Sequence, residues 1–197
     1  MRRHEQHTIS VSYTHLNPAY RKKYELNLKR EFPRIPLYKD FWQWAEWGEQ
    51  LMKLHIDYEK VKPFKLKYEE IKDTKSDAKQ KEMFEKGKEP DSMFARKPRI
   101  KCILKADKEA GVIKLDEIST LSDIPPEAWE YKLGNRSALE WILDQYKESD
   151  PSDPTIREKF NTYKFADYKD HVIDLLKRVC TVSVETISII KQMEKEK

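Results

Sequence analysis

The chain has 197 residues, of which 38% are hydrophobic and 38% charged, and its formal net charge is +4. The 11% aromatic content excludes a wholly disordered polyelectrolyte, because that many rings can build a core. No apolar run approaches the ~18 residues of a membrane span and the N-terminal MRRHEQH is no secretory signal, so we expect a soluble, cytoplasmic protein without membrane contact.

The first predicted helix lies near the N-terminus. Residues 7–16 alternate as a short strand would, and Asn17 with Pro18 then opens a helix, because Asn can cap free amides and Pro suits the first turn. The prolines of FPRIP cannot continue that helix, so we expect it to end near Phe32.

A second helix is predicted from the cap residue Asp40 to about residue 58. Its large apolar side chains recur at helical spacing, which predicts a face that packs against an extensive surface. These residues are Trp44, Trp47, Leu51, Leu54 and Tyr58.

The middle of the chain predicts strands around a charged insert. Residues 64–69 alternate as a strand does, whereas residues 71–97 are nearly all charged or small and predict a long solvated loop or a frayed helix. Residues 99–106 and 111–116 then flank a short polar connection, which predicts an antiparallel hairpin with Gly111 near its turn.

The remainder is predicted to be helical. A short helix follows Pro126 and runs through Trp129, and the capping box SALE starts another at Ser137. The second helix carries a core stripe formed by Leu139, Ile142, Leu143 and Tyr146. Asp167 is expected to cap a further helix, and the β-branched run TVSVETISII either begins a last helix at Ser183 or kinks a long one.

Together these elements predict an α+β fold that is mainly helical, with a small antiparallel β-hairpin or sheet. We expect one domain with four segments along the chain. They are an N-terminal segment at 1–16 whose structure the pattern does not define, a helical and short-strand part at 17–69, a charged mobile loop at 70–97, and the hairpin with the C-terminal helices at 98–197.

Glycine, cysteine and histidine usage excludes several site types. The four glycines cannot form the phosphate loops of P-loop or Rossmann proteins. Cys102 and Cys180 stand far apart without a CxxC pattern, so we expect buried free thiols and neither a disulfide framework nor a zinc site. His55 and His171 lack a second ligand at i+4, so we expect satisfied or surface histidines.

Charge is unevenly spread along the chain. Residues 1–105 hold 25 Lys and Arg against 16 Asp and Glu, a net +9, whereas residues 106–197 hold 14 against 19, a net −5. A basic stripe leads into the predicted hairpin: Arg96, Lys97, Arg99, Lys101 and Lys105. Arg99, Lys101 and Lys105 share one parity and would face one side, as in a β-ribbon that enters a DNA groove. The alternative is an edge strand that lysines protect from aggregation.

The polar loop YKLGNR at 131–136 is a second binding candidate. Its side chains Lys132, Asn135 and Arg136 precede a capped helix and are placed for phosphate or base contacts. The alternative is a structural turn in which Gly134 takes a special backbone angle.

Two other motifs point to chemistry. The tetrapeptide NPAY at 17–20 resembles the NPPY of amino-methyltransferases but departs from it at the third residue, and a helix cap explains it as well. Asp91 followed by Glu130 and Lys132 imitates the PD…ExK pattern of metal-dependent nucleases, in which two carboxylates bind Mg²⁺.

Three segments together resemble the C-terminal specificity region of type ISP restriction-modification enzymes. They are NPAYRKKYELNLKREFPRIPLYKDFWQWAEWGEQLMKLHIDYE, YKLGNRSALEWILDQY and TYKFADYKDHVIDLLKRVCTVSVETISII, and the resemblance covers roughly residues 17–69 and 99–192. In that family one long polypeptide joins a Mrr-like nuclease, a helicase-type ATPase, an N6-adenine methyltransferase and a target recognition domain that reads DNA. Residues 1–16 depart from the family, which suggests a truncated reading frame or an assembly scar.

The resemblance implies a DNA sequence recognition domain without a catalytic centre of its own. It would direct adenine methylation and DNA cleavage by upstream domains, with double-stranded DNA and the methyltransferase and helicase domains of the same enzyme as partners. No cofactor is expected in this chain, because S-adenosylmethionine, ATP and Mg²⁺ would bind upstream. If exposed, the tryptophan-rich helix at 41–58 would be the surface that meets those domains.

Two alternatives from other classes stay open. The first is a stand-alone metal-dependent nuclease built on Asp91 and Glu130, which requires Mg²⁺-dependent cleavage. The second is a helical protein-interaction module whose lysines only increase solubility, and it predicts no salt-dependent affinity for DNA.

Overall fold

A computed structural model describes residues 18–31, 40–71, 100–148, 153–159 and 163–195. The chain divides into two compact units, each built from segments that are distant in sequence. We call residues 1–64, 127–139 and 174–197 the helical unit, and residues 65–126 and 140–173 the sheet unit. The predicted α+β class, mainly helical with small antiparallel sheets, is confirmed.

Two of the predicted features fall outside the described residues. They are the strand at 7–16 and all but the first residue of the charged loop at 71–97. The division of the chain into four sequence segments likewise stays a prediction.

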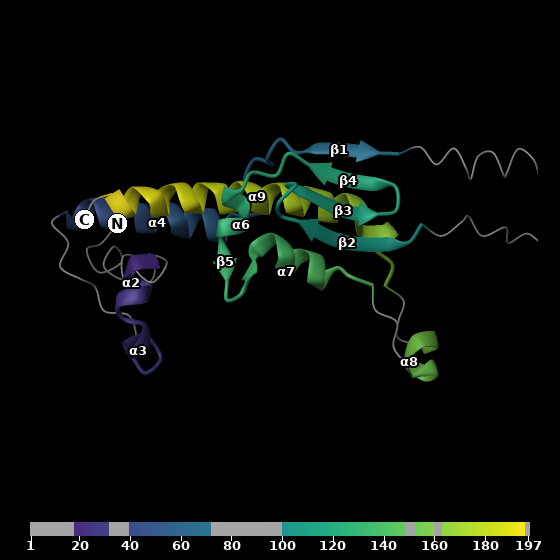
Figure 1. Cartoon of the computed structure of the whole chain (residues 1–197), viewed down its shortest axis with the longest axis horizontal. Helices are drawn as coiled ribbons and strands as arrows, with labels where there is room; N and C mark the ends of the chain where they lie inside the picture. Colours follow the sequence, from purple (N-terminus) through teal and green to yellow (C-terminus); the bar gives the residue numbers. More distant parts are fainter. Residues whose placement is uncertain (1–17, 32–39, 72–99, 149–152, 160–162, 196–197) are drawn as a thin grey trace, which may run out of the picture. The chain divides into compact units, whose positions relative to one another are not determined.

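The tryptophan-rich helix α4 (Phe41–Ile56) is a main element of the helical unit. Asp40 caps it as predicted, since its carboxylate accepts a 3.0 Å hydrogen bond from the Gln43 amide. Helical spacing puts its large apolar residues on one face, and they pack against α9 (Phe165–Lys195), which lies alongside α4 in Figure 1. The cluster consists of Trp44, Trp47, Leu51, Ile189 and Met193.

The helix at 41–58 was predicted to meet other domains only if its tryptophan face is exposed, and this face is buried. Trp44 and Trp47 are each 5% exposed, so α9 already covers the face that was expected to meet another domain. Each such buried side chain contributes roughly 1.5–3 kcal/mol to folding. Tyr58, by contrast, lies beyond the end of α4 and is exposed, so its assignment to the packed face was wrong.

Helix α9 is one continuous helix of 31 residues. A separate last helix starting at Ser183 is therefore wrong, because burial outweighs the low helix propensity of the β-branched run. Ser183 Oγ donates a 2.8 Å bond to the Val179 carbonyl within the helix. The predicted cap at Asp167 is also wrong: the helix begins at Phe165, whose amide donates to the Glu148 carboxylate at 2.9 Å.

The other elements of the helical unit are short. They are α2 (Pro18–Lys23), α3 (Glu25–Leu28), α6 (Glu127–Glu130), β5 (Lys132–Leu133) and β6 (Arg136–Ser137). The helix predicted from Pro18 to Phe32 begins as expected but breaks at Tyr24, whose φ of −112° leaves the helical region. The short helix expected after Pro126 is confirmed by α6.

The sheet unit contains a four-stranded antiparallel sheet in the order β1-β4-β3-β2. Its strands are β1 (Lys67–Glu70), β2 (Cys102–Asp107), β3 (Val112–Asp116) and β4 (Ser119–Ser122). The predicted hairpin is confirmed as β2 and β3, and Gly111 beside its turn has a φ of +64°. A Cβ there would lie 2.8 Å from the Ile124 carbonyl oxygen, so glycine is required. The strand expected at 64–69 begins only at Lys67.

The two faces of this sheet differ in polarity. Ile113 and Leu121 are cross-strand partners and are both 0% exposed. Further buried residues of the unit come from α7 (Ala138–Gln145), which starts as the capping box predicted, and from the first turns of α9: Leu143, Phe165, Val172 and Ile173. The remaining helix is α8 (Pro154–Lys159). Because successive residues of a strand alternate between faces, Lys114 and Thr120 point away from Ile113 and Leu121.

Candidate nucleic-acid interface

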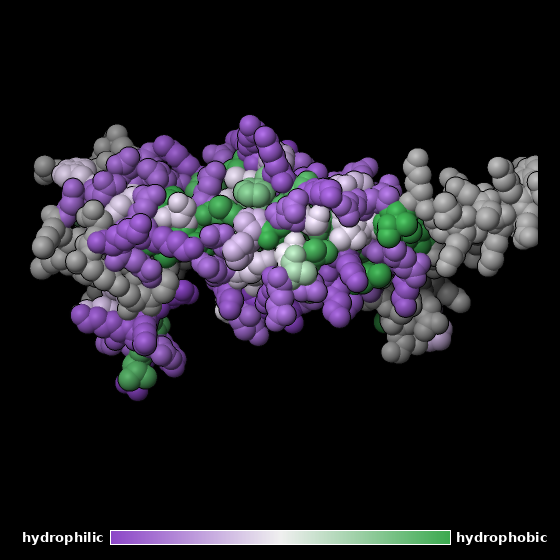
Figure 2. Space-filling view, turned by 45° about the horizontal axis from the view of Figure 1, so that its top comes forward, coloured by the Kyte–Doolittle hydropathy of each residue, from purple (hydrophilic) through white to green (hydrophobic). Residues whose placement is uncertain are grey.

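Two lysines stand opposite each other on the polar face of the sheet. Lys105 of β2 and Lys114 of β3 are Cα partners in the ladder, so their side chains leave the same face as neighbours. Both are exposed. Hydrophilic side chains cover most of the described surface that Figure 2 shows, and a solvated lysine pair fits such a surface.

Lys105 belongs to the predicted basic stripe, whereas Lys114 was not among the predicted site residues. The signal was present, because a turn at 108–111 pairs Asp107 with Val112 and thereby sets Lys105 opposite Lys114. Charge runs alone do not reveal such a pair, since its members are separated by the turn.

Some other lysines of the sheet unit have carboxylate partners. Lys108, in the turn between β2 and β3, lies 2.9 Å from a Glu140 oxygen, and Lys67 lies 2.5 Å from a Glu69 oxygen. Among the residues that the structure describes, Lys105 and Lys114 form no ion pair. They therefore remain available to an external anion.

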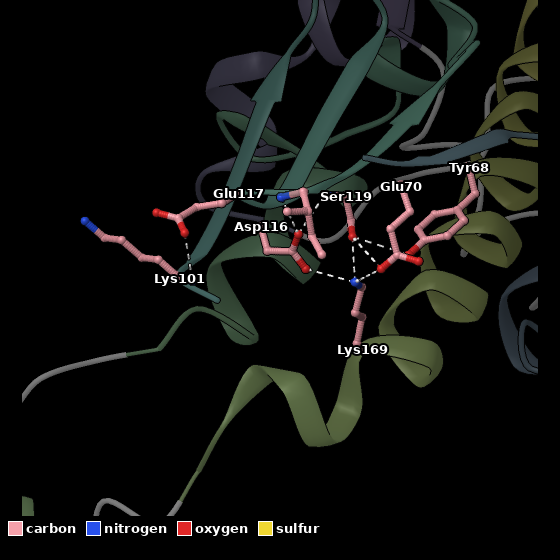
Figure 3. A network of polar contacts seen from close by, with 8 residues as sticks. Tyr68, Glu70, Lys101, Asp116, Glu117, Ser119 and Lys169 are labelled. Atoms are coloured by element: carbon pink, nitrogen blue, oxygen red, sulfur yellow. Dashed lines mark hydrogen bonds and ion pairs between the residues drawn. The ribbon is translucent and has the colours of Figure 1, made fainter. Parts of the chain in front are cut away.

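The rest of the basic stripe is less regular than predicted. Lys101 is exposed just before β2, and its backbone amide lies 3.5 Å from the Glu117 carboxylate (Figure 3). The ladder shifts register between Cys102 and Lys105, where Leu104 has a φ of +41°. This irregularity breaks the strict alternation from which a common face for Lys101 and Lys105 was inferred. Arg96, Lys97 and Arg99 lie outside the described residues.

The polar loop at 131–136 forms the β5–β6 hairpin of the helical unit. Its strand pairs leave Gly134 and Asn135 as the two turn residues. Gly134 has a φ of +72° and a Cβ there would meet nothing within 4 Å, so the backbone angle rather than space requires glycine. The predicted structural turn is thus present, and its polar side chains are also exposed: Lys132, Asn135 and Arg136.

Tyr131 anchors the base of this hairpin. It is 8% exposed and packs in a cluster with Ala138, Ile187 and Ile190. His55 Nδ1 lies 2.6 Å from the Leu51 carbonyl, which can only accept, so Nδ1 carries the proton. In the neutral ring Nε2 then accepts from the Tyr131 hydroxyl at 2.8 Å. His55 is therefore the satisfied histidine that the sequence predicted, and the hairpin projects from a fixed base.

On the buried side of the sheet, Lys169 of α9 forms an ion network (Figure 3). Its ammonium lies 3.0 Å from Asp116 Oδ2, 3.2 Å from Glu70 Oε1 and 2.5 Å from Ser119 Oγ. Asp116 Oδ1 also accepts two backbone amides of its turn, at 3.0 and 2.7 Å. Burial lowers the pKa of Lys169, but hydrogen bonds to Asp116, Glu70 and Tyr68 raise it more, to above 10.5. Because these groups satisfy one another, we assign the network to the fold.

Groups that could carry chemistry are sparse. No cluster of three or more His, Cys, Asp or Glu that could hold a metal occurs within the described ranges. Cys102 and Cys180 are free, and burial raises the pKa of both thiols, that of Cys180 to about 12. From the nuclease pattern, Glu130 is exposed and lies 3.4 Å from Lys191, whereas Asp91 is outside the described residues. Within the described residues, none of the helices combines the length and the apolar composition that a membrane span requires.

Comparison with known proteins gives a consistent set of relatives. The family model for the Type ISP C-terminal specificity domain matches residues 14–175. A cryoEM structure of a DrdV–DNA complex is 49% identical over 96% of this chain, with a TM-score of 0.75. A nuclease-deletion mutant of the Type ISP restriction-modification enzyme LlaGI, in complex with a DNA substrate mimic, is 27% identical over 95%, with a TM-score of 0.63.

A third structure, the ATP-dependent Type ISP restriction-modification enzyme LlaBIII bound to DNA, is 24% identical over 93% of this chain, with a TM-score of 0.60, and shows the shared fold alone. The chain spans 18%, 13% and 11% of the length of these three proteins, in the order given. No curated protein matches the chain.

Proposed function

The chain belongs to the type ISP C-terminal specificity domain family, and we propose that it recognises double-stranded DNA on behalf of a type ISP restriction-modification enzyme. The observation that carries this proposal is the 49% identity, over 96% of the chain, with a protein solved as a DNA complex. At that identity and a TM-score of 0.75 the two chains share a fold.

In the proposed mechanism, phosphate contacts position the domain and a few side chains read bases. Asn135 and Arg136 suit the base edges, because an amide matches adenine and a guanidinium matches guanine in the major groove. Their hairpin is anchored through Tyr131, which supports a fixed orientation of the turn. Lysines suit phosphates, and the candidates are Lys97, Lys101, Lys105 and Lys132, with Arg96 and Arg99 beside them in sequence.

The proposal assigns methylation, cleavage and ATP use to other domains of the enzyme. The methyltransferase and helicase domains would then be partners of this chain, and S-adenosylmethionine, ATP and Mg²⁺ would bind in those domains. The small share of its relatives' length that this chain spans supports such a division of labour. DNA recognition by this chain, and methylation and cleavage by the other domains, would take place in the cytoplasm.

Binding of the purified full chain to mixed-sequence duplex DNA across a salt series tests the proposal. We expect log affinity to fall linearly with log salt, with a slope of about −0.9 for each phosphate contact. A folded chain that does not bind DNA at low salt would favour the protein-interaction module. Mg²⁺-dependent cleavage abolished by Glu130→Ala would favour the nuclease instead.

A further inference from the structure

The lysine pair on the sheet is unfavourable for the fold alone. Lys105 and Lys114 are direct cross-strand partners, and like charges in that relation destabilise a strand pair. Thr120 continues the same row on β4, and Glu69 ends it on β1. Two uncompensated cations and a hydroxyl thus lie side by side across three strands.

Nearby carboxylates are engaged elsewhere. Glu69 at the end of the row lies 2.5 Å from the Lys67 ammonium. Asp107, two residues along β2 from Lys105, accepts a 3.1 Å hydrogen bond from the Ala110 amide in its own turn. Neither carboxylate forms an ion pair with Lys105 or Lys114 in the described part of the chain, so both ammonium groups can receive an external anion.

The chemistry of the pair selects the kind of ligand. A lysine ammonium is a compact point charge on a flexible stem, which suits phosphate oxygens. Partners in an antiparallel ladder lie about 4.5–5.5 Å apart at Cα, so two ammonium groups can reach one phosphate or two successive phosphates of a strand.

We propose that Lys105 and Lys114 form a phosphate clamp that holds the DNA backbone against the polar face of the sheet. This inference rests on the proposed function and deepens it, because it assigns the sheet to positioning the DNA. The clamp adds affinity for any duplex and does not choose the sequence. The clamp pairs Lys105, which was a predicted site residue, with Lys114, which no sequence motif indicated.

The test compares single variants of the full chain, Lys105→Gln and Lys114→Gln, with the parent on mixed-sequence duplex DNA across a salt series. Lys108→Gln is the matched control, because it removes the same charge from the same hairpin at a lysine that pairs with Glu140. Each clamp variant is expected to flatten the salt slope by about 0.9, while the control keeps the slope of the parent.

Folding is checked on the same samples by urea denaturation. Removal of one like charge from the pair is expected to leave the unfolding midpoint unchanged or to raise it, so a loss of affinity cannot be assigned to unfolding. The weakening is also expected to be equal for duplexes of different sequence.

The outcomes separate the clamp from the proposed function. A parent that binds with a steep slope, together with clamp variants that keep this slope, overturns the clamp and leaves the function intact. An equal loss in Lys108→Gln overturns the clamp as well, because the effect is then one of net charge. A folded parent that does not bind DNA overturns both.

Discussion

Replacement of Lys169 by methionine removes the cation at the centre of the ion network in Figure 3. Methionine keeps most of the aliphatic length, so the change is mainly one of charge. It leaves the Asp116 side chain, 5% exposed, without its 3.0 Å ion pair. Loss of one partner from a buried pair costs about 3–5 kcal/mol.

Two features of the network lower that figure. Asp116 keeps two backbone amide bonds, and the Glu70 side chain is 47% exposed, so water can solvate it. We therefore expect Lys169→Met to lower the free energy of unfolding by about 2–4 kcal/mol. Because the pKa of Lys169 is raised above 10.5, its charged form contributes fully at pH 7, and this contribution declines only as the pH rises through that raised value.

The assay is urea denaturation of the full chain at pH 7, followed by circular dichroism. Lys191→Met is the matched control, since Lys191 lies on the same helix, is 49% exposed in its side chain and contacts Glu130 at 3.4 Å. Such a surface pair is worth about 0–1 kcal/mol. A Lys169→Met variant no less stable than the Lys191→Met control would refute the assignment of the network to the fold.

Three further predictions concern the backbone, the hairpin anchor and a thiol. Gly134→Ala should lower the free energy of unfolding by about 1 kcal/mol because Gly134 has a positive φ. Gly111→Ala should lower it more, since the added Cβ would also lie 2.8 Å from a carbonyl oxygen. Equal thermal denaturation midpoints for the two variants would contradict this order. Tyr131→Phe removes the 2.8 Å bond to His55 and should lower the free energy of unfolding by about 1 kcal/mol in urea, whereas an unchanged midpoint would show the bond to be neutral. Burial raises the pKa of the Cys180 thiol to about 12, so this thiol should resist alkylation at pH 8 until the chain unfolds. Any stability that the neutral thiol contributes should be lost as the pH rises from 9.0 to 12. Rapid labelling of Cys180 in the native chain, located by mass spectrometry, would count against its burial.

Local signals predicted the elements that local residues determine. Asp40 has the short acceptor side chain that a helix start needs, and the tryptophans after it recur at helical spacing, so α4 was found with its buried face. Gly111 permits the positive φ beside the β2–β3 turn, so that hairpin was found too. In both cases the decisive interactions lie within a few residues of the signal.

Elements that depend on distant partners were not predictable in the same way. Strand β4 is short and half polar, and its pairing of Ser119 with Glu70 joins residues far apart in sequence. The continuity of α9 depends on burial of β-branched side chains such as Val182 and Ile190, which outweighs helix propensity. Tertiary context therefore decided both features.

The candidate site shows the same division. A run of cations marked Lys105, but its partner Lys114 follows only from the register of the hairpin. A polar turn marked Arg136, but the anchoring of that turn through His55 required the packing of the helical unit. Residue types in the sequence therefore indicated which side chains could bind DNA. Strand pairing and packing in the structure showed which of these side chains lie together and what holds them in place.

The proposed function requires that this domain distinguishes one DNA sequence from another. Selection of bound duplexes from a random-sequence library by the purified full chain tests it most directly, with Arg136→Ala selected in parallel. We expect one recurrent sequence to be enriched, and we expect Arg136→Ala to relax the preference at one position of that sequence. Recovery of bound duplexes with the composition of the starting library would contradict it.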